Sequence, residues 1–173
     1  MEVRINNHGS NSLSTKVFFS DEKGFEVASV IVMGKTNAVL IDAQWTLSNA
    51  HRLIAEIAET GKHLETIYVT HAHPDHYFGL GVIAEAFPSA RVTALASVAR
   101  TINRQFFGKL DHWEKVIGPT NVCRKTVNIE SLSQNSIELE GKRIEILPET
   151  SERPPNWASA VNWVWPSSVL SGL

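Results

Sequence analysis

The sequence predicts a single α/β domain, and three observations support this prediction. The chain has 173 residues, of which 43% are hydrophobic, so it is long enough for one buried core and short for two. Strand-like apolar runs at residues 27–33 and 37–42 are followed by apolar residues at helical intervals between Ala50 and Ala58. A further apolar run at residues 65–70 ends at a group of histidines and an aspartate, and helical spacing then returns.

Residue patterns place the elements of the first half of the chain. The predicted strands lie at residues 16–19, 27–33, 37–42 and 65–70, and the predicted helices lie at residues 48–60 and 80–87. The residues from Gly34 to Thr36 separate two of these strands in the manner of a hairpin turn. Ser48 is a possible N-cap of the first helix and Gly61 is its stop, while Pro88 ends the second helix.

The second half of the chain returns from helices to strands. Helical patterns follow a short strand at residues 90–95, and Gly108 and the Gly118-Pro119 pair interrupt them. The later predicted strands lie at residues 126–132, 136–141 and 142–147. Residues 161–165 alternate in character as a last strand would.

The polar group behind the strand at residues 65–70 reads HAHPDH. His71 and His73 are two positions apart, so in an extended backbone both imidazoles point to the same side and can converge on one cation. Asp75 and His76 are adjacent, so their side chains are expected to diverge, as a second site beside the first requires. In α/β architectures, loops at the carboxyl ends of strands bind ligands because rigid elements on both sides hold their side chains.

A shared metal is the simplest explanation for four metal-capable side chains within six positions. Protonated histidines would repel one another, and the same groups buried without partners would be costly, so a metal makes the crowding favourable. Imidazole and carboxylate are ligands that zinc accepts, and a catalytic zinc keeps a coordination position for water. Its function would be to lower the pKa of that water from about 15.7 to about 7.

The HAHPDH motif resembles the HxHxDH signature of the metallo-β-lactamase superfamily. The run NAVLIDAQ resembles the family's upstream strand that ends in an aspartate, and the resemblance covers roughly residues 27–147. It implies an α/β fold of the αββα sandwich type, with one or two metal ions, commonly zinc, and with iron or manganese as alternatives. In this scheme His71 and His73 bind the first metal, while Asp75 and His76 bind the second.

The resemblance also implies an activity. The superfamily hydrolyses lactams, lactones, thioesters and phosphodiesters, so the fold does not select the substrate. We therefore expect a hydrolase that uses a metal-bound hydroxide on an ester, lactone, thioester or related small molecule, with Asp75 as the catalytic residue. Asp42 is expected to steady the site from behind the ligands. The amidohydrolases also use an HxH pair, but their (β/α)8 barrel needs about 250 residues and does not explain Asp75 and His76.

Downstream of the motif the sequence departs from the family's pattern. The superfamily adds a third histidine, a bridging aspartate and a final histidine, whereas here no histidine follows His112. Glu149, or Asn156, occupies the position of the third histidine ligand. We expect residues 1–173 to form one domain that is incomplete at its C-terminus and corresponds to the N-terminal half to two-thirds of the sandwich.

Two functional alternatives follow from this departure. In the first, Glu149 substitutes as a metal ligand or a partner chain completes the site, and a homo-oligomer could cover the incomplete sandwich. In the second, the chain is a truncated or degenerate member that binds metal or a partner without turnover.

Charge and composition limit the expected partners and location. The 16 basic and 18 acidic residues give a formal charge of -2 without a block of one sign, so we expect neither nucleic acid nor a membrane surface as a partner. No stretch approaches the roughly 18 apolar residues of a membrane span. Cys123 is the only cysteine, which excludes an internal disulfide. We expect a cytoplasmic protein that acts on a small-molecule substrate.

Overall fold

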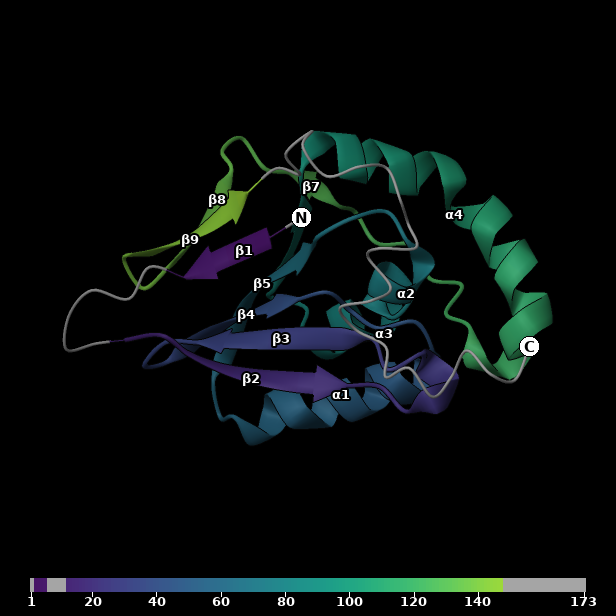
Figure 1. The fold of residues 1–173 in the computed structure, drawn as a ribbon, viewed down its shortest axis with the longest axis horizontal. Coiled ribbons are helices and arrows are strands. Elements are labelled where there is room, and N and C mark those ends of the chain that lie inside the picture. Colours follow the sequence, from purple (N-terminus) through teal and green to yellow (C-terminus); the bar gives the residue numbers. More distant parts are fainter. Residues whose placement is uncertain (1, 6–11, 148–173) are drawn as a thin grey trace, which may run out of the picture.

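The structure, a computed structural model, describes residues 2–5 and 12–147 of the chain (Figure 1). Its strands are β1 (Glu2–Ile5), β2 (Ser14–Phe19), β3 (Ala28–Met33), β4 (Asn37–Ile41), β5 (His63–Val69), β6 (Arg91–Ala94), β7 (Glu130–Ser131), β8 (Ser136–Leu139) and β9 (Lys142–Leu147). Its helices are α1 (Leu47–Glu59), α2 (Pro74–Tyr77), α3 (Leu80–Ala86) and α4 (Ala96–Ile117), with 3-10 turns η1 (Glu22–Gly24) and η2 (Pro119–Asn121). The expected strand at residues 161–165, Glu149 and Asn156 lie outside the described residues.

The strands form two sheets. One has six strands in the order β2-β3-β4-β5-β6-β7, and the other has three in the order β1-β9-β8. Strands β2, β3 and β4 are antiparallel, which confirms the hairpin predicted at residues 34–36, whereas β4 to β7 pair in parallel. Parallel pairing brings the carboxyl ends of β4 and β5 to the same edge of the sheet, where α/β proteins bind ligands.

The centre of the six-stranded sheet is buried on both faces. Along β4, Val39 and Ile41 belong to an apolar cluster shared with β8 and β9, whereas Leu40 belongs to a cluster shared with α1, α3 and α4. Successive residues of a strand point to opposite faces, so this alternation places the sheet between two layers. Figure 1 shows α1 and the three-stranded sheet on opposite sides of it. The described residues thus supply two sheets and one helix layer of the expected αββα sandwich.

The inner face of the sheet is only partly covered at β2 by the part of the chain that the structure describes. Val17 and Phe19 are 47% and 61% exposed, and they pair in register with Val30 and Ala28 of β3. An edge strand with large exposed apolar side chains is normally covered by another element.

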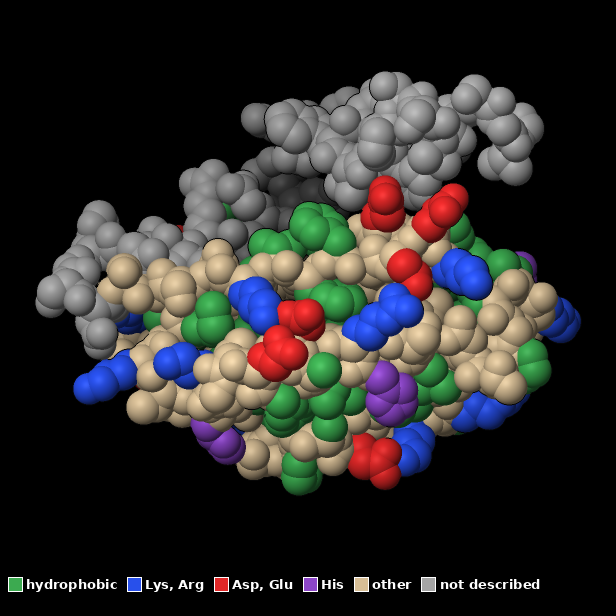
Figure 2. Space-filling model, turned by 90° about the horizontal axis from the view of Figure 1, so that it is seen from below, with side chains coloured by type: hydrophobic (Ala, Val, Ile, Leu, Met, Phe, Trp, Pro, Cys, Tyr) green, Lys and Arg blue, Asp and Glu red, His purple; other side chains and the backbone are tan. Residues whose placement is uncertain are grey.

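The face of the molecule that carries α1 has mixed charges. Figure 2 shows basic and acidic side chains interspersed there without a block of one sign. Lys16 of β2 lies 2.5 Å from Glu56 of α1, and Arg52 lies 2.8 Å from Asp21. None of the helices in the described ranges is both long enough and apolar enough to cross a membrane.

The helix ends predicted at Gly61 and Gly118 are confirmed, whereas the predicted N-cap at Ser48 and the interruption at Gly108 need correction. The hydroxyl of Thr46 accepts a hydrogen bond from the Asn49 N–H at 3.3 Å, so Thr46 is the N-cap of α1, and Ser48 is the second residue of the helix. The expected interruption at Gly108 is wrong, because α4 runs through it from Ala96 to Ile117. A glycine inside a helix costs only about 1 kcal/mol. Burial of the apolar face on both sides of Gly108 outweighs that cost.

Three shorter elements also differ from the sequence prediction. The strand predicted at residues 126–132 is reduced to the two residues of β7. Strand β1 was not predicted, because its four residues, EVRI, give too short an alternation to distinguish a strand. Helix α2 was not predicted either, although Pro74 at its first position is a common way to begin a helix. As a result, Asp75 and His76 lie on a helical turn and not in an irregular loop.

Glu140 joins the β8–β9 turn of one sheet to the β3–β4 turn of the other. Its carboxylate accepts hydrogen bonds from the backbone N–H groups of Lys35, Thr36 and Asn37 at 2.7, 2.7 and 2.8 Å. These bonds, led by that from Thr36, lower the pKa of Glu140 from its ordinary 4.5 to about 2. The three N–H donors therefore stabilise the charged form of Glu140, and the same hydrogen bonds join the two turns.

We predict that Glu140→Gln lowers the urea midpoint of unfolding at pH 6, whereas Glu138→Gln, on exposed β8 surface, does not. Because the pKa of Glu140 is lower in the folded chain than in the unfolded chain, its contribution is complete above pH 4.5 and is lost as the pH falls toward 2. The midpoint of the wild-type chain should therefore fall more steeply between pH 4.5 and 2 than that of the variant. Equal pH slopes would contradict this role.

Candidate metal centre

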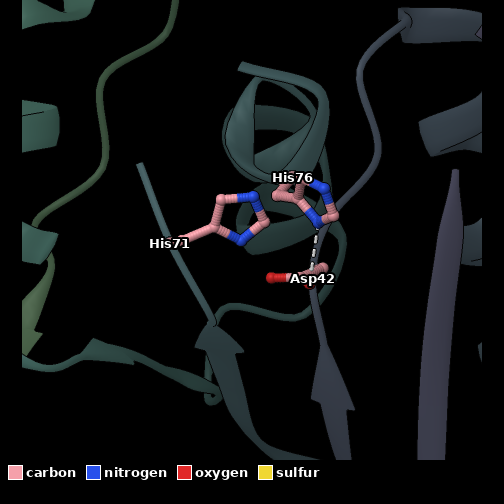
Figure 3. A group of neighbouring side chains, drawn as sticks. All are labelled: Asp42, His71 and His76. Atoms are coloured by element: carbon pink, nitrogen blue, oxygen red, sulfur yellow. Dashed lines mark hydrogen bonds and ion pairs between the residues drawn. The ribbon is translucent and has the colours of Figure 1, made fainter. Parts of the chain in front are cut away.

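Two neighbouring parallel strands bring the candidate site together at one edge of the sheet. Asp42 follows β4 directly, and His71 follows β5 by two residues. His76 comes from α2, the helical turn behind the histidine loop. One ligand-type atom from each of these three residues lies within 4.8 Å of the others, and Figure 3 shows the two rings next to each other above the Asp42 carboxylate.

The backbone around Asp42 is shaped to reach α2. Asp42 has φ of 61° and Gln44 has φ of 69°, a left-handed conformation that non-glycine residues rarely adopt. The turn lets the Ala43 N–H donate to His76 O at 2.8 Å, and Gln44 O accept from the Gly79 N–H at 2.9 Å. A Cβ on Gly79 would lie 2.1 Å from Ala43 O, so only glycine permits this approach. Strained backbone of this kind is typical of functional sites.

The carboxylate of Asp42 is the centre of the hydrogen-bond network. It is 5% exposed. Oδ1 accepts from the Thr70 backbone N–H at 2.8 Å, and the Thr70 hydroxyl donates to the carboxylate at 2.8 Å from Oδ2 and 3.0 Å from Oδ1. Oδ2 also accepts from Nδ1 of His76 at 2.8 Å. Both carboxylate oxygens therefore accept hydrogen bonds from protein donors, an arrangement that is compatible with the supporting position expected for Asp42 behind the ligands.

The same network determines which nitrogen of His71 is available to a metal. The Thr70 hydroxyl has a single proton, which it donates to Asp42, so toward Nδ1 of His71, 2.8 Å away, it acts as an acceptor. Nδ1 of His71 then carries the ring proton, and Nε2 keeps its lone pair. Nδ1 of His76 likewise donates to Asp42. Fixing a ligand histidine through its second nitrogen is how proteins orient metal ligands.

His73 and Asp75 complete the sequence-predicted group, at its outer side. The ring centroids of His71 and His73 are 4.6 Å apart, and those of His71 and His76 are 4.1 Å apart. Asp75 does not diverge from His76 as expected, because Oδ2 of Asp75 lies 3.2 Å from Nε2 of His76. The helical turn of α2 causes this difference, since adjacent side chains of a helix are not directed to opposite sides as in a strand.

The ionisation of the two inner histidines differs. Burial, followed by the positive charge of His76, lowers the pKa of His71 to about 4. Burial alone would lower the pKa of His76, but hydrogen bonds to the carboxylates of Asp42 and Asp75 outweigh it and raise that pKa to about 10. At neutral pH the His71 ring is therefore neutral, whereas Nε2 of His76 carries a proton that a metal would have to displace.

The donor set fits a divalent metal. Imidazole nitrogen and carboxylate oxygen are ligands of zinc, iron and manganese. Burial is the largest single influence on the pKa of Asp75 and raises it, but the hydrogen bond from His76, the charge of His76 and a backbone hydrogen bond together lower it by more. The pKa therefore lies below its ordinary value, and the carboxylate is charged at neutral pH. The group contains the neutral imidazole of His71, the imidazole of His76 and the charged carboxylate of Asp75. The buried carboxylate of Asp42 lies behind them.

Two residues of the site were missed by the sequence reasoning. Thr70 ends the predicted strand, and its hydroxyl links Asp42 to His71. Lys109 comes from α4, far along the chain, and its Nζ donates to Ala72 O at 2.5 Å. A threonine directly before a histidine is a signal that the sequence offers, whereas nothing in the local sequence indicates that Lys109 reaches this loop.

We predict that Asp42→Ala weakens zinc affinity by about 10 to 100-fold, as loss of a group behind metal ligands typically does. The cause is the release of both His71 and His76 from their fixed ring orientations. Zinc dissociation constants measured by competition with a chromophoric chelator provide the test, with Asp111→Ala on the exposed side of α4 as the control. An unchanged zinc dissociation constant for Asp42→Ala would show that Asp42 is an ordinary turn residue with no part in metal binding.

Solved structures with a similar backbone are metallo-beta-lactamases. SMB-1 bound to 2-mercaptoethanesulfonate has a TM-score of 0.52 and 20% identity, over 69% of this chain and 46% of that chain. MEM-A1, a subclass B3 metallo-beta-lactamase isolated from a soil metagenome library, has a TM-score of 0.52 and 15% identity, over 76% and 53%. DIM-1 exposed to ceftazidime has a TM-score of 0.50 and 20% identity, over 80% and 55%. This chain spans about half the length of these relatives, and the likeness concerns the fold.

The family itself is identified at the level of sequence. No curated protein matches the chain. Residues 22–149, however, match the sequence model of the metallo-beta-lactamase superfamily. The matched range contains Asp42 and the whole HAHPDH motif. The chain is therefore a member of the metallo-beta-lactamase superfamily.

Proposed function

We propose that this chain is a metal-dependent hydrolase whose metal is held by His71, His73, Asp75 and His76. The proposed substrates are esters, lactones, thioesters or related small molecules. The observation that carries the proposal is the Asp42 network, which leaves Nε2 of His71 free and ties Nδ1 of His76. A purely structural cluster has no need to hold an imidazole lone pair available.

The proposed metal is zinc, with iron or manganese as alternatives. When bound, it supplies Lewis acidity that makes water a nucleophile near neutral pH. The chain itself orients the ligands, because the Thr70 hydroxyl and the Asp42 carboxylate hold the rings of His71 and His76 in place. We assign the catalytic role to Asp75, whose side chain is 32% exposed and whose carboxylate is charged at neutral pH. The Asp75 carboxylate would accept a proton from the attacking water.

The metal proposal predicts near-stoichiometric zinc, iron or manganese in the purified chain, and its loss in a His71→Ala, His73→Ala double variant. The matched control is His51→Ala with His63→Ala, because both residues are exposed and lie on α1 and β5, away from the loop. Elemental analysis of the three proteins after identical purification gives the comparison. If the His71 and His73 variant retained the wild-type metal content, the ligand assignment would be wrong.

A second candidate function is metal binding without efficient turnover. The observation in its favour is that no histidine follows His112 in the 173 residues. Further ligands would then come from Glu149, from Asn156 or from another chain. A carboxylate in place of an imidazole reduces the net positive charge on the metal and so its ability to acidify water.

The second candidate predicts slow or absent hydrolysis of lactone, thioester and phosphodiester test substrates by the metal-loaded chain. Fast metal-dependent hydrolysis that Glu149→Ala abolishes would instead identify Glu149 as a ligand that completes a competent site. Fast hydrolysis that Glu149→Ala leaves intact would remove Glu149 from the site and favour the hydrolase over the second candidate.

A further inference from the structure

A lysine from α4 reaches the backbone between the two leading histidines of the site. Lys109 Nζ donates to the carbonyl oxygen of Ala72 at 2.5 Å, and Ala72 separates His71 from His73. The lysine is half-buried. Its partner is 37 residues away in sequence, so the contact depends on how α4 packs.

Helix α4 is attached to the metal loop at a second point, one turn before Lys109. The ring of Phe106 lies 6.2 Å from that of Tyr77 and 6.0 Å from that of Phe78, at the end of α2. Residues three apart on a helix share a face, so Phe106 and Lys109 approach the loop together. The apolar contact holds α4 against α2, and this packing places the lysine ammonium at the Ala72 carbonyl.

The Ala72 carbonyl lies in a part of the loop that no regular element holds in place. Ala72 lies after the end of β5 and before the beginning of α2, where neither a ladder nor a helix fixes the peptide plane. A hydrogen bond from an ammonium group is shorter and about twice as strong as one between neutral groups. Holding this carbonyl fixes the plane of the peptide that joins Ala72 to His73, and with it the direction of the His73 side chain.

We propose that Lys109 is a positioning residue of the metal centre: by holding the Ala72 carbonyl, it sets the separation and direction of His71 and His73. This inference rests on the proposed metal function. Asp42 and Thr70 fix the rings of His71 and His76 from below, whereas no contact from that network reaches His73 among the described residues. Lys109 supplies the restraint on that side.

The charge of Lys109 acts in the opposite direction to its hydrogen bond. A positive charge beside a metal site repels the metal, so removing it should tighten binding if electrostatics dominates. Removing the hydrogen bond should loosen the loop and weaken binding. The two explanations therefore predict opposite signs for a neutral substitution, and arginine, which keeps both the charge and the donors, serves as the rescue variant.

The test compares the full chain with Lys109→Met, Lys109→Arg and the control Lys115→Met, an exposed lysine in the last turn of α4. We expect Lys109→Met to weaken Zn²⁺ and Co²⁺ binding about 10-fold and to shift the visible absorption bands of bound Co²⁺. Lys109→Arg and Lys115→Met should retain both the affinity and the spectrum. Equal or tighter binding by Lys109→Met would overturn the positioning role while leaving the metal proposal intact.

Hydrogen exchange in the metal-free chain provides a readout that does not depend on the metal proposal. The His76 N–H donates to His73 O at 3.0 Å, and the Ala43 N–H donates to His76 O at 2.8 Å. We expect both amides to exchange faster in Lys109→Met than in Lys115→Met, and unchanged exchange would overturn the inference even if no metal bound. Should Lys109→Met prove unfolded by its melting curve, Lys109→Gln is measured with the same expectations.

Discussion

The geometry of the candidate site depends on one buried carboxylate. Asp42 accepts hydrogen bonds from two groups of Thr70 and from His76, and through the Thr70 hydroxyl it also determines the proton position on His71. A buried charge is costly unless donors surround it, and this one is surrounded on both oxygens. The carboxylate of Asp42 therefore orients two imidazoles that come from different elements.

The fold supplies what this carboxylate requires. Parallel pairing of β4 and β5 brings Asp42 beside Thr70, and the left-handed turn at Asp42 carries the following chain to α2. Gly79 permits the close approach of that turn, and α4 packs over the far side through Phe106. Each of these features lies on a different element, so the site is assembled by the packing of the domain and not by the HAHPDH segment alone.

Much of this arrangement could be predicted from the sequence. Apolar spacing indicated the β3–β4 hairpin, α1, β5 and α3, and the crowded histidines indicated a metal site after β5. Asp42 was expected behind the ligands, because a carboxylate at the end of an apolar strand has no other evident reason to be there. The side-chain types carry this information locally, since strands, helices and metal ligands each have a short-range pattern.

The remaining features depend on contacts that the local sequence does not encode. Continuity of α4 through Gly108 follows from burial against the sheet, and the reach of Lys109 to Ala72 follows from the packing of that helix. The approach of Asp75 to His76 follows from the helical turn of α2, which four residues are too few to predict. Sequence reasoning therefore identified the candidate ligands more readily than the groups that contact them.

The tautomer of His71 in the metal-free chain tests the central claim most directly. Long-range ¹H–¹⁵N correlation of the imidazoles at neutral pH distinguishes a proton on Nδ1 from one on Nε2. The Asp42 network predicts a neutral His71 with its proton on Nδ1, so that Nε2 is ready to bind a metal. A proton on Nε2 of His71 would contradict that prediction, because the Thr70 hydroxyl could then no longer link the ring to Asp42 in the direction that the structure requires.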